Sequence, residues 1–362
     1  MTAPARFDAE LRWAAQERDS EFHRYLATSR FGSLDGLRAI SIIAVIWQHT
    51  VPAALSGTTW GHVGAYGVTL FFAISGFLIT TLLIREQRRH GRIDLKAFYV
   101  RRSLRIFPLY YAVLLLYVLL VWVMERDSPD GREFFANLAY FATYTSNLFV
   151  ELDGRVIFYF AWSLATEEQF YLVWPPLLVL CGVNKRALVL IATVLLVLAA
   201  DEIWGGFQWH RAPVAIVGGA VLALLVSYER GYRFLYPVFG QRYSSLLCAI
   251  LVIVLLAIPG TKIFLIHLAL VALVAACVLR EDHVLGGAMR WAPFAFIGSI
   301  SYGMYLLHML SANAAQKLLA IGSISAGYAV FPLALVISTC AAYVSFRYFE
   351  SPFLRLKSRF GR

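Results

Sequence analysis

Charged residues are scarce in this sequence. Only 15% of its 362 residues are Asp, Glu, Lys or Arg, whereas 60% are hydrophobic; in soluble domains charged residues make up about a quarter. Runs of about 17 to 22 mostly apolar residues recur along the whole length, each long enough to cross roughly 30 Å of hydrocarbon. This composition excludes an ordinary soluble domain and predicts an all-α integral membrane protein.

Cysteine is also rare, and its four copies lie in or beside apolar runs. They form no close pair and have no histidine at metal-ligand spacing, which excludes a disulfide framework and a zinc motif. We therefore expect no metal site and four inert thiols that pack as small hydrophobic side chains. These residues are Cys181, Cys248, Cys277 and Cys340.

A cleavable signal peptide is not visible, because the first apolar run follows about 36 residues of mixed charge. We expect the first span to be a retained signal-anchor. Helical spacing in the preceding segment predicts a helix on the cytoplasmic face, with a disordered tail as the alternative. The residues at that spacing are Leu11, Ala15, Arg18, Phe22 and Tyr25.

Eleven apolar runs are candidate spans, but eleven crossings would place three basic segments opposite the basic loop at 85–105. That would break the positive-inside rule. The run at 134–150 is the most polar, and leaving it out places every basic loop in the cytoplasm. The runs lie near 37–55, 66–84, 106–124, 134–150, 163–182, 187–204, 212–227, 244–258, 263–279, 293–312 and 325–346.

The predicted architecture is therefore about ten transmembrane helices with both termini in the cytoplasm. Residues 125–162 form an extracytoplasmic or re-entrant element between spans three and four. A cytoplasmic segment covers residues 1–33, the membrane domain 34–353, and a basic cytoplasmic tail 354–362. The net charge of +10 is explained by this topology, so we expect the lipid bilayer and no nucleic acid as a partner.

Three ionisable side chains from separate segments reach overlapping depths on this topology. His49 lies about 18 Å from the inner boundary, and Glu167 and His308 lie within about 8 Å of the outer one. Ionisable groups in a span cost about 2.5 to 3.5 kcal/mol, so they usually face a cavity and serve a function. The alternative is a set of polar contacts that join helices. Convergence of three segments favours a catalytic centre.

The inner face carries a dense arginine cluster in the loop at 85–105. The positive-inside rule or anionic lipid explains most of it. Arg102 and Arg105 are three residues apart and share a helix face, where two guanidinium groups suit phosphate oxygens. Their neighbour Arg101 is a further candidate for the same ligand.

Six stretches, in order, are DGLRAISIIAVIWQH, GVTLFFAISGFLIT, RRSLRIFPLYY, WSLATEEQFYLVWP, SYGMYLLH and FRYFESPF. Over residues 35–353 they resemble the acyltransferase-three family of bacterial membrane O-acyltransferases, which acylate lipopolysaccharide, peptidoglycan, exopolysaccharide, nodulation-factor and macrolide hydroxyls. The resemblance implies ten spans in the bacterial inner membrane. It also implies an acyl-coenzyme A donor bound from inside, with acetyl-coenzyme A the first expectation, and an acceptor presented outside.

The resemblance also implies residue roles. The family's arginine and histidine of the first span correspond to Arg38 and His49, and its catalytic glutamate corresponds to Glu167. The coenzyme A arginines fall on Arg102 and Arg105. For acceptor binding we expect Trp162, Ser163, Tyr305, His308 and Asn147.

The expected reaction is acyl transfer to a hydroxyl of a sugar, glycolipid or glycan, without a tightly bound cofactor. His49 acts either as a general base or as a transient acyl carrier, and the sequence leaves both open. Glu167 orients or charge-stabilises the imidazole, or helps to position the acceptor. A soluble esterase-like domain, which some family members append, is not recognised, so the acceptor stays undefined. The alternatives are a proton-coupled exporter and a non-catalytic scaffold.

Overall fold

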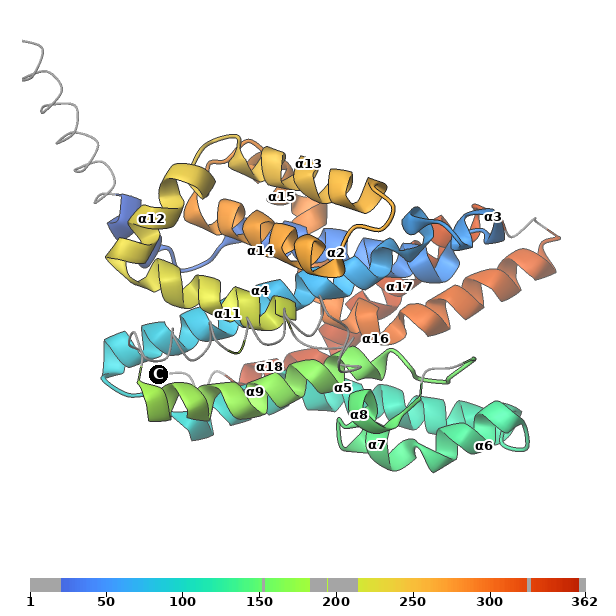
Figure 1. The fold of residues 1–362 in the computed structure, drawn as a ribbon. Helices are drawn as coiled ribbons and strands as arrows, with labels where there is room; N and C mark the ends of the chain where they lie inside the picture. The colour runs from blue at the N-terminus through green and yellow to red at the C-terminus, as the bar shows by residue number, and fades with distance from the viewer. Residues whose placement is uncertain (1–20, 152–153, 183–193, 195–213, 324–326, 358–362) are drawn as a thin grey trace, which may run out of the picture.

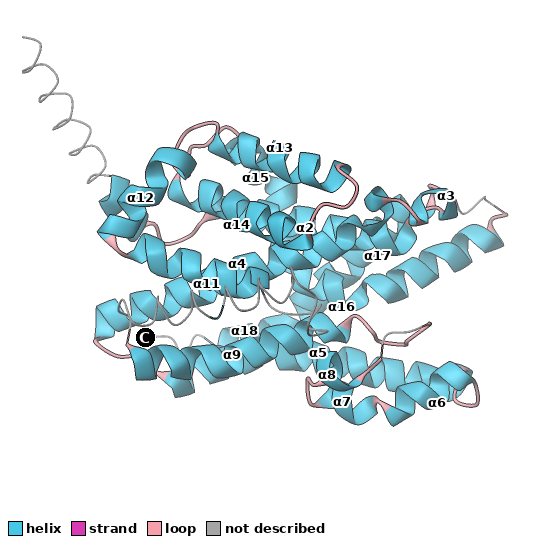
Figure 2. Ribbon diagram, in the orientation of Figure 1, coloured by secondary structure: helices cyan, strands magenta, loops and turns pink. Residues whose placement is uncertain are grey.

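A computed structural model describes residues 21–151, 154–182, 194, 214–323 and 327–357. Within these ranges the chain is helical and forms no β-strand, as Figure 2 shows. The expected all-α architecture is confirmed for this part of the chain. Its helices are α2 (Gly32–Thr50), α3 (Ala53–Ser56), η1 (Thr59–His62), α4 (Val63–His90), α5 (Leu95–Met124), α6 (Pro129–Ala136), α7 (Leu138–Ala142), α8 (Ser146–Phe149), α9 (Ala161–Cys181), α11 (Val214–Ser227), α12 (Glu229–Phe239), α13 (Ser244–Ala257), α14 (Ile263–Leu279), α15 (Gly286–Met289), α16 (Ala292–Ile321), α17 (Val330–Val344), η2 (Ser345–Glu350) and α18 (Ser351–Lys357).

Four helical segments are long and apolar enough to cross a membrane: η1 with α4, α5, α16, and α17 through Leu356. The pair α11 and α12, which bends by 111°, would be a fifth. Four other predicted spans coincide with α2, α9, α13 and α14, which are shorter or less apolar. Apart from residue 194, the run at 187–204 lies outside the described residues. Ten spans and their orientation stay predictions.

Helices α2, α4, α11 and α16 form the centre of the molecule (Figure 1). Helices α13 and α14 lie on one side, whereas α5, α9 and the short helices α6 to α8 lie on the other. The central interfaces use small residues, which let backbones approach closely. A Cβ at Gly76 of α4 would lie 1.8 Å from the Ile216 carbonyl of α11. A Cβ at Gly298 of α16 would lie 1.9 Å from the Asp35 carbonyl of α2.

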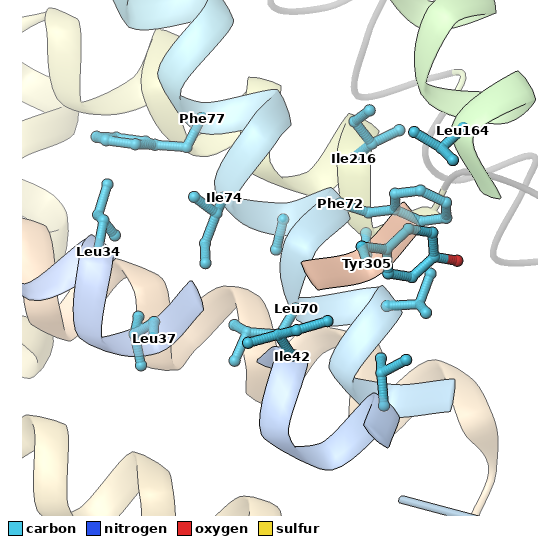
Figure 3. Close-up of a cluster of buried hydrophobic side chains, with 14 of the residues drawn as sticks. Leu34, Leu37, Ile42, Leu70, Phe72, Ile74, Phe77, Leu164, Ile216 and Tyr305 are labelled. Carbon is cyan, nitrogen blue, oxygen red and sulfur yellow. The ribbon is translucent and has the colours of Figure 1, made fainter. Parts of the chain in front are cut away.

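Apolar side chains fill the space between these central helices. Figure 3 shows Leu34 of α2 near Ile74 and Phe77 of α4, with Ile42 further along α2 and Ile216 contributed by α11. All five are buried. Burying each such side chain stabilises the fold by about 1.5 to 3 kcal/mol where water is the alternative. This packing fixes α2 and α4, which carry much of the site described below.

The apolar run at 134–150 does not form one long helix. It is divided among α6, α7 and α8, and none of these has more than 8 residues. Tyr144, between α7 and α8, and Phe158, just before α9, have left-handed backbones with φ of 54° and 66°. Tyr110 of α5 stacks on Tyr144 at 4.3 Å and contacts Phe158 edge-on at 5.8 Å. The prediction that this run is not a membrane span agrees with the structure.

The N-terminal segment packs on helix α12. Residues 21–27 are helical, and the rings of Phe22 and Tyr25 lie 5.3 and 5.5 Å from that of Tyr232. All three side chains are buried. The remaining residues of the predicted N-terminal helix, Leu11, Ala15 and Arg18, lie outside the described residues, as does the tail from 358 onward.

Candidate active site

A cavity of about 610 Å³ lies between α2, α4, α5, α9 and α16. Its lining on α4 extends from Val68 to Arg85, which is about 25 Å of helix. This α4 wall carries apolar side chains such as Phe72 and Leu78, and a polar one, Ser75. The cavity therefore covers most of the depth that a hydrocarbon core would have.

Five arginines line this cavity: Arg30, Arg38, Arg85, Arg102 and Arg105. The Arg30 side chain is 74% exposed and pairs with Asp35, so we call the other four the arginine end. The guanidinium of Arg102 lies 5.1 Å from the centre of the Tyr171 ring and 5.9 Å from that of Phe98. These cation–π contacts hold its position while leaving its N–H groups available. Both predicted phosphate ligands, Arg102 and Arg105, therefore reach the cavity.

Arg85 belongs to the arginine end although its sequence context did not distinguish it from its basic neighbours. Its guanidinium lies 5.2 Å from the centre of the Phe31 ring. Its Nη2 is buried and has no hydrogen-bond partner among the described residues. Buried donors in native structures are nearly always paired, so an unpaired guanidinium nitrogen at a cavity suits an anionic ligand.

Carboxylates partly balance this positive charge. Asp35 accepts from Arg30 at 2.5 Å and from Arg38 at 3.4 Å. Glu350 of η2 also lines the cavity. Arg101, by contrast, contacts Glu86 at 3.1 Å and is not among the described residues that line the cavity. The structure thus separates Arg101 from its predicted companions.

Glu167 lines the cavity and accepts a short hydrogen bond from the Tyr171 hydroxyl, one helical turn further along α9. Tyr171 is the residue against which Arg102 stacks. No hydrogen bond joins Glu167 to His49 in the part of the chain that the structure describes. Glu167 is therefore linked through Tyr171 to the arginine end. Of the roles expected for Glu167, a direct contact that orients the His49 imidazole is not seen among the described residues, and positioning of the acceptor stays a prediction.

His49 and His308, which we call the histidine pair, come together from α2 and α16. Their ring centroids are 5.0 Å apart. The hydroxyl of Tyr159 lies 2.8 Å from Nε2 and 3.0 Å from Nδ1 of His49. The predicted meeting of these two histidines is present, and Tyr159 is a neighbour that the sequence reading did not identify.

The protonation of His308 follows from its partner. Its Nδ1 lies 2.5 Å from the carbonyl oxygen of Tyr305, and a carbonyl can only accept, so Nδ1 carries the hydrogen. Its Nε2 is buried and has no hydrogen-bond partner among the described residues. In its neutral form, His308 therefore presents an unprotonated Nε2 inside the protein.

Ser163 and Tyr305 lie where the cavity meets the histidine pair. Their hydroxyls are 2.5 Å apart, and each lies 3.1 Å from the carbonyl oxygen of Phe160. Both residues line the cavity, while the Tyr305 ring contacts that of His308 at 5.4 Å. Of the residues expected to bind the acceptor, Ser163, Tyr305 and His308 are brought together.

The two other expected acceptor ligands lie elsewhere. The ring of Trp162 packs edge-on against Phe72 at 6.2 Å. Asn147 exchanges two hydrogen bonds with the side-chain amide of Gln169, at 3.0 and 2.8 Å. Neither Trp162 nor Asn147 is among the described residues that line the cavity. The contacts of Asn147 attach α8 to α9.

Comparison with known proteins supplies the family. The model of the acyltransferase-three family, described as "Acyltransferase domain", matches residues 31–347. The chain belongs to this acyltransferase family. The match and the long apolar helices together make the chain a multi-pass membrane protein. No solved structure gives a significant match.

Relatives in the acyltransferase-three family are O-acetyltransferases by name. YrhL of Bacillus subtilis, provisionally named a peptidoglycan O-acetyltransferase, is 26% identical over 370 residues, covering 92% of this chain and 55% of the relative. The peptidoglycan O-acetyltransferase OatA of Listeria monocytogenes is 26% identical over 356 residues, covering 88% and 55%. A provisionally named O-acetyltransferase of Staphylococcus aureus is 34% identical over 175 residues, covering 46% and 28%. The chain thus spans about half the length of its first two relatives.

Proposed function

We propose that this protein is a membrane O-acyltransferase that moves an acyl group, acetyl in the first instance, from cytoplasmic acyl-coenzyme A to a glycan hydroxyl outside. The observation that carries the proposal is the cavity with an arginine end on one side and the histidine pair next to its Ser163–Tyr305 boundary. Neither His49 nor His308 is among the described residues that line the cavity, and the histidine pair adjoins it through the Tyr305 ring.

The arginine end suits the phosphates of coenzyme A. Arg102 and Arg105 offer guanidinium forks that match phosphate geometry, and the unpaired Nη2 of Arg85 adds a donor. The apolar wall formed by Phe72 and Leu78 suits the pantetheine arm. The volume of about 610 Å³ lies within the range of roughly 300 to 1,000 Å³ for small-molecule sites.

The chemistry would take place at His49. In one route, His49 takes the proton from the acceptor hydroxyl, and the hydroxyl oxygen attacks the thioester carbonyl. The carbon–sulfur bond then breaks, and the departing thiolate recovers the proton from His49. In the other route, an unprotonated imidazole nitrogen of His49 attacks the thioester carbonyl, the carbon–sulfur bond breaks, and coenzyme A departs as the thiolate. The acceptor oxygen then attacks the acyl group and the carbon–nitrogen bond to His49 breaks. Nε2 of a neutral His308 would accept the hydroxyl proton, which finally returns to the thiolate.

The family resemblance and the names of the relatives guide the remaining assignments. Ten spans with cytoplasmic termini in the inner membrane would place the arginine end inside, where acyl-coenzyme A is present. The first two relatives are named for peptidoglycan, which supports a carbohydrate acceptor for this chain. The sugar hydroxyl would reach the histidine pair from the opposite side of the membrane.

Donor binding tests this function without knowledge of the acceptor. The thermal midpoint of purified protein is measured with and without acetyl-coenzyme A for wild type, His49→Ala, Arg101→Ala and the Arg102→Ala/Arg105→Ala double variant. A ligand at one hundred times its Kd stabilises by about 2.7 kcal/mol. We expect a shift in all but the double variant. No shift in wild type with acetyl- or longer acyl-coenzyme A would reject the donor and favour an exporter.

A further inference from the structure

We propose that Tyr159 is a positioning residue for His49, presented by the turn Phe158–Phe160. This inference rests on the proposed function, because it assigns to the acyl-transfer site a residue outside all six sequence motifs. Tyr159 precedes α9 and lies 110 residues from His49 in sequence. Its role depends on the way in which the turn is folded.

The contact between the two side chains suits an imidazole that changes protonation. The Tyr159 hydroxyl lies 2.8 Å from Nε2 and 3.0 Å from Nδ1 of His49. The two rings meet edge to face, with centroids 5.6 Å apart and planes at 74°. A phenol hydroxyl both donates and accepts, so it can donate to an unprotonated nitrogen or accept from a protonated one. It can therefore hold the ring before and after proton transfer.

The turn that carries Tyr159 is fixed by a left-handed residue. Phe158 has φ of 66°, a conformation that bulky L-residues rarely adopt and that persists only when the surroundings enforce it. Its ring is buried and lies 4.9 Å from Tyr117, 5.5 Å from Phe141 and 5.8 Å from Tyr110. An aromatic cluster from α5 and α7 thus enforces the backbone that directs Tyr159.

The next residue of the turn contacts the rest of the site. The ring of Phe160 lies 5.2 Å from that of His308. Its carbonyl oxygen lies 3.1 Å from the hydroxyls of both Ser163 and Tyr305. Through Tyr159 and Phe160, the turn therefore contacts both histidines of the pair and the hydroxyls of Ser163 and Tyr305. Glu167, which was expected to orient His49, instead accepts from Tyr171.

Histidine-selective nitrogen-15 NMR of the full chain in detergent micelles tests the contact without any substrate. The His49 signals are assigned by their loss in His49→Gln. We expect Tyr159→Phe, which removes only the hydroxyl, to shift the His49 ring-nitrogen signals. Tyr110→Phe is the matched control, because it removes a buried hydroxyl that donates to the Phe141 carbonyl at 2.7 Å within the same aromatic cluster. It should leave those signals in place.

Kinetics in native membranes, where the cell's own acceptor is present, test the consequence. Coenzyme A release is followed against acetyl-coenzyme A concentration. We expect Tyr159→Phe to lower kcat by about tenfold, as for a lost hydrogen bond of about 1.4 kcal/mol. The KM for acetyl-coenzyme A should stay near the wild-type value, because the arginine end is unaltered. Tyr110→Phe should change neither constant.

The possible failures are distinguishable. An active wild type with an equally active Tyr159→Phe variant, or His49 signals unchanged by that substitution, overturns the positioning role alone. Equal kcat losses in Tyr159→Phe and Tyr110→Phe overturn it as well, because a general effect on the aromatic cluster would explain both. A wild type that neither binds nor consumes acetyl-coenzyme A overturns the proposed function and this inference with it.

Discussion

The arginine end and the histidine pair are held in place by different forces. At the arginine end, guanidinium groups rest on aromatic faces and near carboxylates, and Arg105 is exposed. At the histidine pair, the neighbours are neutral rings and hydroxyls from α9, α16 and the turn before α9. Charge is thus concentrated where an anionic donor would bind, and neutral aromatic packing surrounds the proposed reacting atoms. Binding and chemistry should therefore be separable by mutation.

The largest expected effect is at the histidine pair. His49→Ala should lower acyl transfer by about 10²- to 10⁴-fold, the usual contribution of a general acid–base group. Coenzyme A release measures this loss, and the thermal shift with acetyl-coenzyme A should remain. Loss of that shift together with activity would show that the two regions do not work separately.

A pH effect on folding must be distinguished from one on the chemistry. His283, in the loop after α14, is buried between the hydroxyls of Ser33 at 2.9 Å and Ser245 at 2.8 Å. Burial, and to a smaller extent Arg290, lowers the pKa of His283 to about 4, and only Asp282 opposes this.

The unfolded chain therefore binds more protons than the folded one between pH 6.5 and 4. The contribution of His283 to the free energy of unfolding is fully present above pH 6.5. It decreases by about 3 kcal/mol as the pH falls towards 4. Thermal midpoints across this range should fall more steeply for wild type than for His283→Gln. Parallel pH profiles would refute the contribution of His283.

At the arginine end, the expected effect is on binding. The Arg102→Ala/Arg105→Ala variant should lose the stabilisation of about 2.7 kcal/mol that saturating acetyl-coenzyme A gives to wild type. Arg101→Ala is the matched control, because Arg101 contacts Glu86 instead of the cavity. A variant of Arg101 that binds as poorly as the double variant would place the donor phosphates elsewhere.

The smallest effect concerns a residue that belongs to neither region. Asn147→Ala should lower the free energy of unfolding by about 1 to 2 kcal/mol, because it removes the paired amide contacts with Gln169. Chemical denaturation measures this change. Transfer to the native acceptor should keep its wild-type KM, and a raised KM would restore Asn147 as an acceptor ligand.

Local sequence features anticipated much of this arrangement. Hydropathy predicted the helices, and the polar character of 134–150 predicted that this run is not a span. The three-residue spacing of Arg102 and Arg105 predicted that the two side chains share a helix face, and both line the cavity. These inferences succeeded because they depend on helical periodicity and on the cost of placing polar groups in hydrocarbon.

Side-chain partners were less accessible from the sequence. Orienting His49 was one of the roles expected for Glu167. Helical spacing does not determine which donor a carboxylate accepts from, and in the structure Glu167 accepts from Tyr171 on the same helix. Arg85 looked like any other arginine in a basic loop. It became distinct only because α4 places it on the cavity wall with an unpaired nitrogen.

The sequence by itself determined an all-helical membrane chain of the acyltransferase-three family, with the histidines His49 and His308 at overlapping depths. The tertiary structure decided that Tyr159 contacts His49. That contact needs a left-handed backbone at Phe158, which is unfavourable for an isolated phenylalanine. It is enforced by rings distant in sequence, among them Tyr110 and Tyr117. A conformation that exists only because remote side chains compensate its cost cannot be read from local sequence.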